Sequence, residues 1–152
     1  MSRGMKRIGI FLLITFFIIG LSGCTNTNEK DLEEELDKIL TNFKEEIQNT
    51  EKVVLAVHDD NGEILGLDGW TYKEKQVITN QETITKIINV INKATLQLII
   101  ETNYIGKLIQ FYDGNDNLIA EYEGHCLLNE DYSIGINVNN KDFNSLLYLF
   151  EQ

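Results

Sequence analysis

The sequence is poor in the residues that build several common kinds of functional site. It has no proline, only two cysteines and two histidines among 152 residues, and its only arginines are Arg3 and Arg7. In residues 24–152, ten lysines stand against 24 acidic residues, a formal charge of −14. Arginine grips phosphate with two hydrogen bonds, and a strongly negative chain repels other polyanions. The composition therefore argues against nucleic-acid binding. The negative charge either serves only solubility, which we favour, or attracts a cationic peptide, a basic protein surface or a divalent ion.

The residues of known catalytic motifs are also scarce. Ser133 and Ser145 are the only serines after residue 24, and neither lies in a Gly-x-Ser-x-Gly motif. His125 and Cys126 are neighbours in an expected strand, so their side chains should point to opposite faces. A zinc site needs about four ligands, and His58 with Cys126 offers two. We therefore expect no catalytic residues, no metal site and no cofactor, and we interpret Cys126 as a buried structural residue.

One acidic segment begins like a calcium-binding loop. Asp113, Asn115 and Asn117 alternate as the first ligands of such a loop do. The sixth position should be glycine and is Leu118, and the twelfth should be glutamate and is Gly124. The segment is therefore interpreted as a solvated hairpin turn.

The N-terminus has the three parts of an export signal. Basic residues at positions 3, 6 and 7 precede an almost wholly apolar run over residues 8–19, which is shorter than the roughly 20 residues of a membrane-spanning helix. Leu21-Ser22-Gly23-Cys24 follows and resembles the lipobox of bacterial lipoproteins. The resemblance implies cleavage before Cys24, a lipid on its sulfur, and a body held at the extracytoplasmic face of the cell membrane. The alternative is an uncleaved N-terminal anchor.

These features divide the chain into four expected parts. Residues 1–23 form the signal peptide, residues 24–28 a short tether, residues 29–49 an acidic amphipathic helix, and residues 50–152 a small α+β domain. The helix has a single apolar stripe made of Leu32, Leu36, Ile39, Leu40, Phe43 and Ile47, with Asn28 as its expected N-cap. The stripe either packs on the domain's own sheet, which we favour, or stands free and pairs with a partner.

The body alternates strand and helix patterns. Strands are expected at residues 52–58, 63–67, 72–79, 96–101, 107–112, 118–123 and 132–138, the first two joined by a hairpin at Asn61-Gly62, and the pattern leaves open a further short strand at 125–128. Thr79 and Glu82 form an expected capping box for a helix with Ile84, Ile87, Ile88 and Ile91 on one face, and a last helix begins near Lys141. We predict an α+β fold, with an antiparallel sheet of about five to seven strands and two or three helices packed on one face.

Trp70 is the one candidate binding residue that stands out, together with Tyr72. Both lie beside a glycine-containing segment, and tryptophan and tyrosine are enriched in binding hot spots. The other interpretation, which we favour, is that Trp70 closes the end of the core. We predict a non-enzymatic lipoprotein that binds a protein or peptide, as immunity or exclusion lipoproteins do by analogy. The alternative function is an envelope assembly factor that pairs through the helix at residues 29–49.

Overall fold

The computed structural model describes residues 27–97 and 106–152 of the chain. Three α-helices, one 3₁₀ segment and eight strands lie in these ranges: α2 (Thr27–Glu46), η1 (Ile47–Asn49), β1 (Lys52–His58), β2 (Ile64–Leu65), β3 (Thr71–Ile78), α3 (Gln81–Asn92), β4 (Thr95–Leu96), β5 (Lys107–Tyr112), β6 (Leu118–Glu123), β7 (Cys126–Leu128), β8 (Ser133–Asn137) and α4 (Asn140–Leu149). The predicted signal peptide, Cys24 and most of the tether lie outside the described residues, as does most of the expected strand at 96–101.

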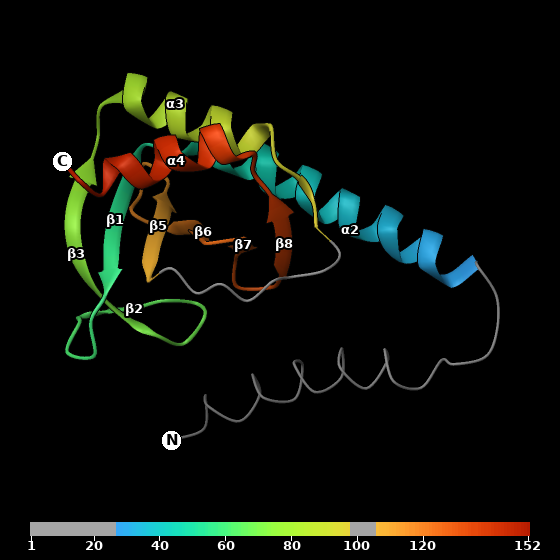
Figure 1. Ribbon diagram of the computed structural model, residues 1–152, viewed down its shortest axis with the longest axis horizontal. Coiled ribbons are helices and arrows are strands. Elements are labelled where there is room, and N and C mark those ends of the chain that lie inside the picture. The colour runs from blue at the N-terminus through green and yellow to red at the C-terminus, as the bar shows by residue number, and fades with distance from the viewer. Residues whose placement is uncertain (1–26, 98–105) are drawn as a thin grey trace. The chain divides into compact units, whose positions relative to one another are not determined.

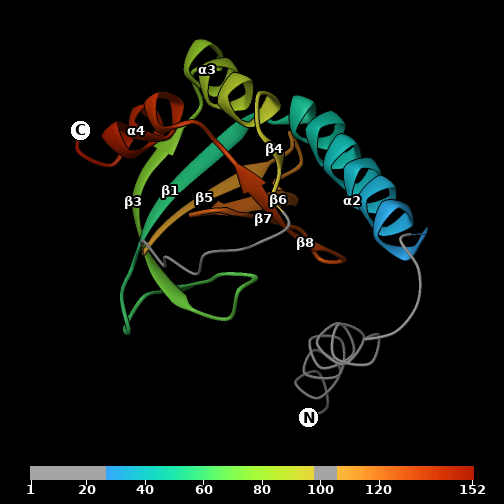
Figure 2. The ribbon, with the colours of Figure 1, turned by 45° about the vertical axis from the view of Figure 1, so that its right-hand side comes forward.

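The eight strands form an antiparallel sheet in the order β2-β3-β1-β5-β6-β7-β8-β4. Figures 1 and 2 show α3 and α4 covering the same side of this sheet, while β2 lies at the end away from them. The predicted α+β class and antiparallel sheet are confirmed, with one more strand than the upper expectation. Contacts divide the chain into two units, residues 1–33 and 34–152.

The main hydrophobic core lies between the sheet and the helices. The isoleucine stripe of α3 is buried as predicted, and Leu55, Ile109 and Phe111 face it from the sheet. The core also takes in Leu40, Phe43 and Ile47, which are at most 5% exposed. The C-terminal part of α2 therefore packs on the domain itself, as the favoured interpretation of the stripe predicts. Leu32, nearer the start of the helix, is 53% exposed.

The expected hairpin at Asn61-Gly62 is wrong. The turn itself forms, because Asp59 accepts from the backbone N–H groups of Asn61 and Gly62. However, β1 pairs with β3 and β5, whereas β2 pairs with the far side of β3. A Cβ at Gly62 would lie 2.2 Å from the backbone of Tyr72. Gly62 is therefore needed because the chain passes close to the backbone of β3 at this position. It does not serve a tight β1–β2 hairpin, which does not form.

Two expected helix starts also differ by a few residues. The N-cap of α3 is Asn80, whose side chain accepts from the backbone N–H of Thr83 at 3.0 Å, so the Thr79–Glu82 capping box is wrong. Glu82 instead pairs with Lys86 along the helix. Asn28 lies inside α2 and so does not precede its first turn. Asparagine accepts from a free N–H at a helix start as well as threonine does, so the sequence alone did not distinguish Thr79 from Asn80 as the N-cap of α3.

Candidate functional site

The segment after β2 places Trp70 at the surface. Residues 66–70 connect β2 to β3, and together with Leu65, the last residue of β2, they form what we call the 65–70 loop. Leu65 and Trp70 are 64% and 52% exposed, so the loop presents two large apolar side chains. The interpretation of Trp70 as a plug of the core is therefore wrong. Tyr72 is 0% exposed, so it cannot share the proposed contact surface with Trp70.

Hydrogen bonds inside the loop fix its backbone. Gly66 N–H donates to Trp70 C=O at 2.9 Å, and Gly69 N–H donates to Gly66 C=O at 3.0 Å. Gly69 has φ +90°, a conformation that only glycine adopts without strain. A Cβ at Gly66 would lie 2.5 Å from the carboxylate of Asp68. Both glycines are thus required by the path of the chain.

Asp68 ties the loop to β3. Its Oδ1 accepts from Trp70 N–H at 2.9 Å, and its Oδ2 accepts from the Tyr72 hydroxyl at 2.5 Å. Tyr72 in turn packs with Ala56, Leu108 and Ile64 in a small apolar cluster that is separate from the main core. Buried Tyr72 therefore supports the 65–70 loop through its hydroxyl and its packing. It forms no part of a binding surface, contrary to the expectation from the sequence.

Glu121 holds the loop from the middle of the sheet. This β6 residue is 0% exposed, and its Oε2 accepts from Leu67 N–H at 2.6 Å. Its Oε1 accepts from Gln110 Nε2 at 2.7 Å, and Gln110 Oε1 accepts from the Tyr112 hydroxyl at 2.9 Å. Burial raises the pKa of Glu121 above its ordinary value, and the nearby charge of Asp68 adds to this, while the two N–H donors oppose it.

His58 lies between Trp70 and its acidic neighbours. The imidazole meets the Trp70 ring edge-on, with centroids 5.3 Å apart, and the Tyr72 ring at 6.2 Å. Its Nε2 is 3.5 Å from a carboxylate oxygen of Asp60, whose side chain is 88% exposed. An exposed indole and an exposed carboxylate therefore flank the same imidazole.

His58 and Cys126 are not brought together. They lie on β1 and β7, which β5 and β6 separate, so the strands carrying them are about 14 Å apart. Cys126 is a free thiol and is half-buried, whereas full burial was expected from the sequence. Burial raises its pKa, and the carboxylates of Glu123 and Asp68 raise it further, so little reactive thiolate forms. The described residues contain no group of three or more His, Cys, Asp or Glu side chains arranged to hold a metal ion.

The Asp113 segment forms a hairpin turn as predicted, whereas His125 lies in the turn before β7 and not in the expected strand. The His125 ring stacks on Phe143 of α4, with centroids 5.7 Å apart and planes 17° from parallel. Cys126 pairs with Glu123 on the next strand. The Asp113 carboxylate accepts from the backbone N–H groups of Asn115 and Asn117, both at 2.8 Å, within a turn that joins the paired strands β5 and β6. The side-chain amide of Asn117, which donates to Asp113 Oδ2 at 2.9 Å, and these backbone N–H groups lower the pKa of Asp113 and leave its carboxylate committed to the turn.

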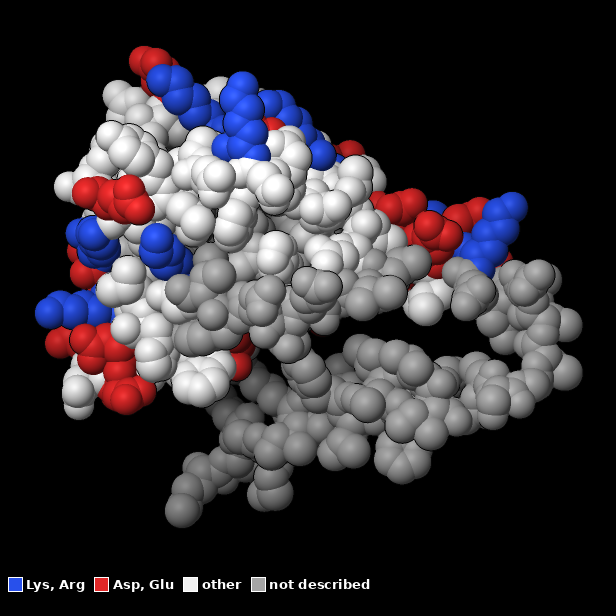
Figure 3. Space-filling model, in the orientation of Figure 1, with Lys and Arg blue, Asp and Glu red and all other residues white. Residues whose placement is uncertain are grey.

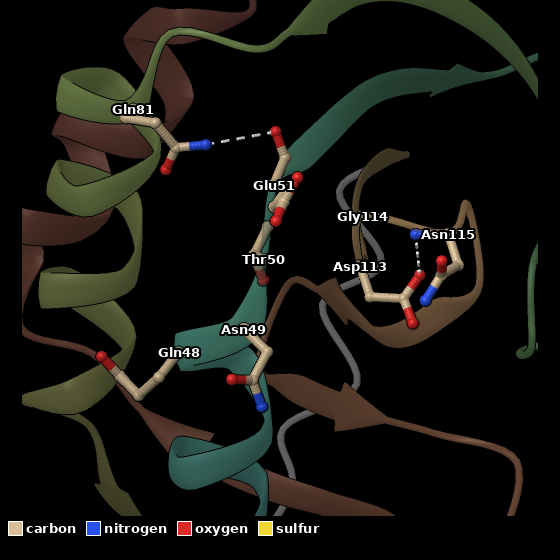
Figure 4. Close-up of a pocket in the computed structure, with 8 residues that line it drawn as sticks. All are labelled: Gln48, Asn49, Thr50, Glu51, Gln81, Asp113, Gly114 and Asn115. Atoms are coloured by element: carbon tan, nitrogen blue, oxygen red, sulfur yellow. Dashed lines mark hydrogen bonds between the residues drawn. The ribbon is translucent and has the colours of Figure 1, made fainter.

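A polar hollow lies beside this turn. It has a volume of about 860 Å³ and collects eight residues from η1, the start of β1, α3 and the turn: Gln48, Asn49, Thr50, Glu51, Gln81, Asp113, Gly114 and Asn115 (Figure 4). Gln81 Nε2 donates to Glu51 C=O at 3.4 Å across it. The Thr50 hydroxyl is buried with no hydrogen-bond partner among the described residues. The lining holds no nucleophile beside a base and no aromatic ring, so it has neither the groups for acyl transfer nor a stacking surface.

Sequence reasoning missed the residues that position the loop. Asp68 was visible only as a break in the strand pattern, and Glu121 alternates with apolar neighbours as a solvent-facing strand residue would. Their roles depend on which strand lies beneath which loop, and no local pattern carries that information. The spacing of Gly66 and Gly69 around Asp68 was the available signal for a tight, ordered loop.

No helix in the described ranges contains a stretch long and apolar enough to span a bilayer. No protein-family model matches the chain, and neither a search of curated proteins nor a search of solved structures returns a match.

Proposed function

We propose that this protein is a lipid-anchored lipoprotein of the extracytoplasmic membrane face and that it binds a protein or peptide through the 65–70 loop. One observation supports the binding site most directly: Leu65 and Trp70 are exposed on a loop whose backbone is fixed by Asp68 and Glu121. A rigid aromatic residue loses little conformational freedom on binding, and tryptophan is the residue most often found at hot spots. The Leu-Ser-Gly-Cys24 motif supports the anchor.

The anchor is tested by replacing Cys24 with alanine. The wild-type protein is expected to enter the detergent phase on detergent phase separation, and its N-terminal peptide is expected to carry a diacylglyceryl thioether in mass spectra. The Cys24→Ala protein should keep residues 1–23 and lose the lipid mass. Equal size and equal partitioning of the two proteins would contradict lipid attachment.

The binding site is tested by replacing Trp70 with alanine in the lipidated, full-length protein. Tyr148→Ala is a matched control, because Tyr148 is 58% exposed but lies on α4. Partners crosslinked and co-purified from the native membrane should be lost with Trp70→Ala and kept with Tyr148→Ala. For the isolated partner, loss of a hot spot weakens binding about 30-fold. Equal recovery with both variants would contradict the loop as the binding site.

The alternative function is an envelope assembly factor that pairs through α2. The 53% exposure of Leu32 supports it, because this member of the apolar stripe lies outside the core. Deleting the whole helix would remove Leu40 and Phe43 from the core, so a single Leu32→Lys substitution is the better test. If Leu32→Lys abolishes co-purification and Trp70→Ala does not, then α2 carries the interaction.

A further inference from the structure

The surface around Trp70 is acidic as well as apolar. Residues 59–72 contain four acidic residues and no lysine, and the nearest lysine in sequence is Lys73, the next residue. The four are Asp59, Asp60, Glu63 and Asp68. Figure 3 shows acidic side chains grouped at the lower left of the view, near the turn after β1, with basic side chains directly above them.

The four carboxylates have different roles. Asp59 and Asp68 each accept hydrogen bonds from backbone N–H groups of their own turns. Asp60 and Glu63 are exposed. Two of the charges therefore serve the local structure, and two face solvent, of which Asp60 lies beside the imidazole that contacts the indole.

We infer that the partner presents a lysine or arginine side chain to the Trp70 ring, with Asp60 and Glu63 as its counter-charges. This inference rests on the proposed function and names the chemistry of the partner. A cation within about 6 Å of an indole face is attracted by the negative face of the ring, and tryptophan is the best of the aromatic residues for this contact. Because His58 contacts both the Trp70 ring and Asp60, a basic side chain that approaches the indole beside this imidazole also comes close to the Asp60 carboxylate.

The charge complementarity decides between possible occupants of this surface. A second copy of this chain would bring the same acidic surface, and a nucleic acid or anionic lipid would bring more negative charge, so each of these is repelled. A basic peptide segment satisfies both the apolar ring and the carboxylates. Leu65, 64% exposed, would contact the aliphatic stem of the same lysine or arginine or an apolar neighbour of it.

The chain provides its own reporter, because Trp70 is its only tryptophan. The full-length protein in non-ionic detergent is titrated with N-acetylated, C-amidated tetralysine while the emission of Trp70 is followed. Tetraglutamate, capped in the same way, is the control peptide. The expected result is a saturable change in Trp70 emission with tetralysine and none with tetraglutamate. No change with tetralysine would overturn the inference.

Paired charge variants separate a local site from general attraction to an acidic protein. Asp60→Asn/Glu63→Gln and Glu34→Gln/Glu35→Gln each remove two exposed negative charges, the second pair from α2. The first variant should weaken tetralysine binding about three- to tenfold, since each exposed charge contributes modestly. The second should weaken it less than twofold. Equal weakening by both variants would overturn the inference.

The outcome also distinguishes this inference from the proposed function. If Trp70→Ala abolishes co-purification of the native partner while tetralysine leaves Trp70 emission unchanged, then the loop binds a partner of different chemistry. In that case the proposed function stands and the inference fails. If Trp70→Ala keeps the native partner as well as Tyr148→Ala does, then the proposed binding site itself is wrong.

Discussion

The two faces of the sheet bury different kinds of side chain. On the helix-covered face, Leu55, Ile109, Tyr122, Leu127 and Ile134 lie side by side across five strands and belong to the main core. On the other face, the corresponding row is Val54, Gln110, Glu121 and Leu128. Gln110 and Glu121 are 2% and 0% exposed, so this face buries a hydrogen-bonded polar pair in the middle of its row.

The difference shows how each face is covered. Apolar contacts have no directional requirement, so α3 and α4 cover the first face simply by burying apolar surface against it. A loop exposes its own backbone N–H groups, and a buried N–H needs an acceptor. Glu121 provides that acceptor for Leu67. A loop that covers a sheet therefore needs a buried acceptor for its backbone N–H groups. This need explains why the Glu121 carboxylate, paired with Gln110, lies in the interior.

The largest expected effect tests the helix-covered face. Phe43→Ala removes a ring that is 1% exposed and leaves a cavity between α2 and the sheet. The free energy of unfolding should fall by about 3–5 kcal/mol, measured by urea denaturation. Leu32→Ala, in the same helix, should change it by less than about 0.5 kcal/mol. Equal effects of the two substitutions would contradict the division of α2 into a core half and an exposed half.

The next largest effect tests the opposite face. Glu121→Leu leaves Leu67 N–H and Gln110 Nε2 buried without an acceptor, and should lower the free energy of unfolding by about 1–3 kcal/mol. Glu121→Gln keeps one acceptor oxygen and should lower it less. Trp70 emission should change in Glu121→Leu, because the 65–70 loop loses its fixed point on β6. If the Glu121→Leu variant proved as stable as the wild type, the polar pair would add nothing to stability.

A smaller effect tests the start of α3, which covers the apolar face. Asn80→Ala should lower the free energy of unfolding by about 1 kcal/mol, because the Thr83 N–H loses its acceptor. Thr79→Ala is the matched control and should cost only a few tenths of a kcal/mol. If Thr79→Ala were the more damaging substitution, the capping box expected from the sequence would be restored.

The smallest effect is the pH dependence of the polar face. The folded-state pKa of Glu121 is raised, so the folded protein binds its proton more tightly than the unfolded chain does. The resulting stability is fully present below about pH 4.5, the ordinary glutamate value, and is lost as the pH rises through the folded-state pKa. Urea midpoints of the wild type should therefore fall relative to those of Glu121→Gln as the pH rises above 4.5. A constant difference between the two would contradict the raised pKa.

The sequence predicted the apolar face far better than the polar one. The four isoleucines of α3 recur with the helical period, and burial of that stripe is a property of the helix alone. The neighbours of β1 depend on long-range pairing. Asn61-Gly62 has the local form of a hairpin, but β3 competes for β1 with six paired residues, whereas β2 contains only two residues. Local turn chemistry therefore predicted the turn and not the strand order.

The candidate site was only half predictable for a similar reason. The glycines around Trp70 indicated a loop, but the favoured interpretation placed the indole at the end of the core, and its 52% exposure contradicts this. Tyr72 and Glu121 follow the alternation of exposed strand positions, yet both are fully buried. They are buried because the 65–70 loop folds over them, and a tertiary contact of this kind leaves no periodic signal in the sequence.

The outer border of β3 has a consequence for how molecules of this protein behave at high local concentration. Among the described strands, β3 pairs on its outer side only with β2, at Thr71 and Tyr72, and the remaining positions begin with Lys73, Glu74 and Lys75. The pairing with β1 shifts opposite Lys75, whose ammonium donates to the Phe150 carbonyl. Lysines and bulges at a sheet border discourage strand addition from a neighbouring molecule. Crowded copies should therefore resist strand addition at this border of the sheet, and that resistance is independent of what the 65–70 loop binds.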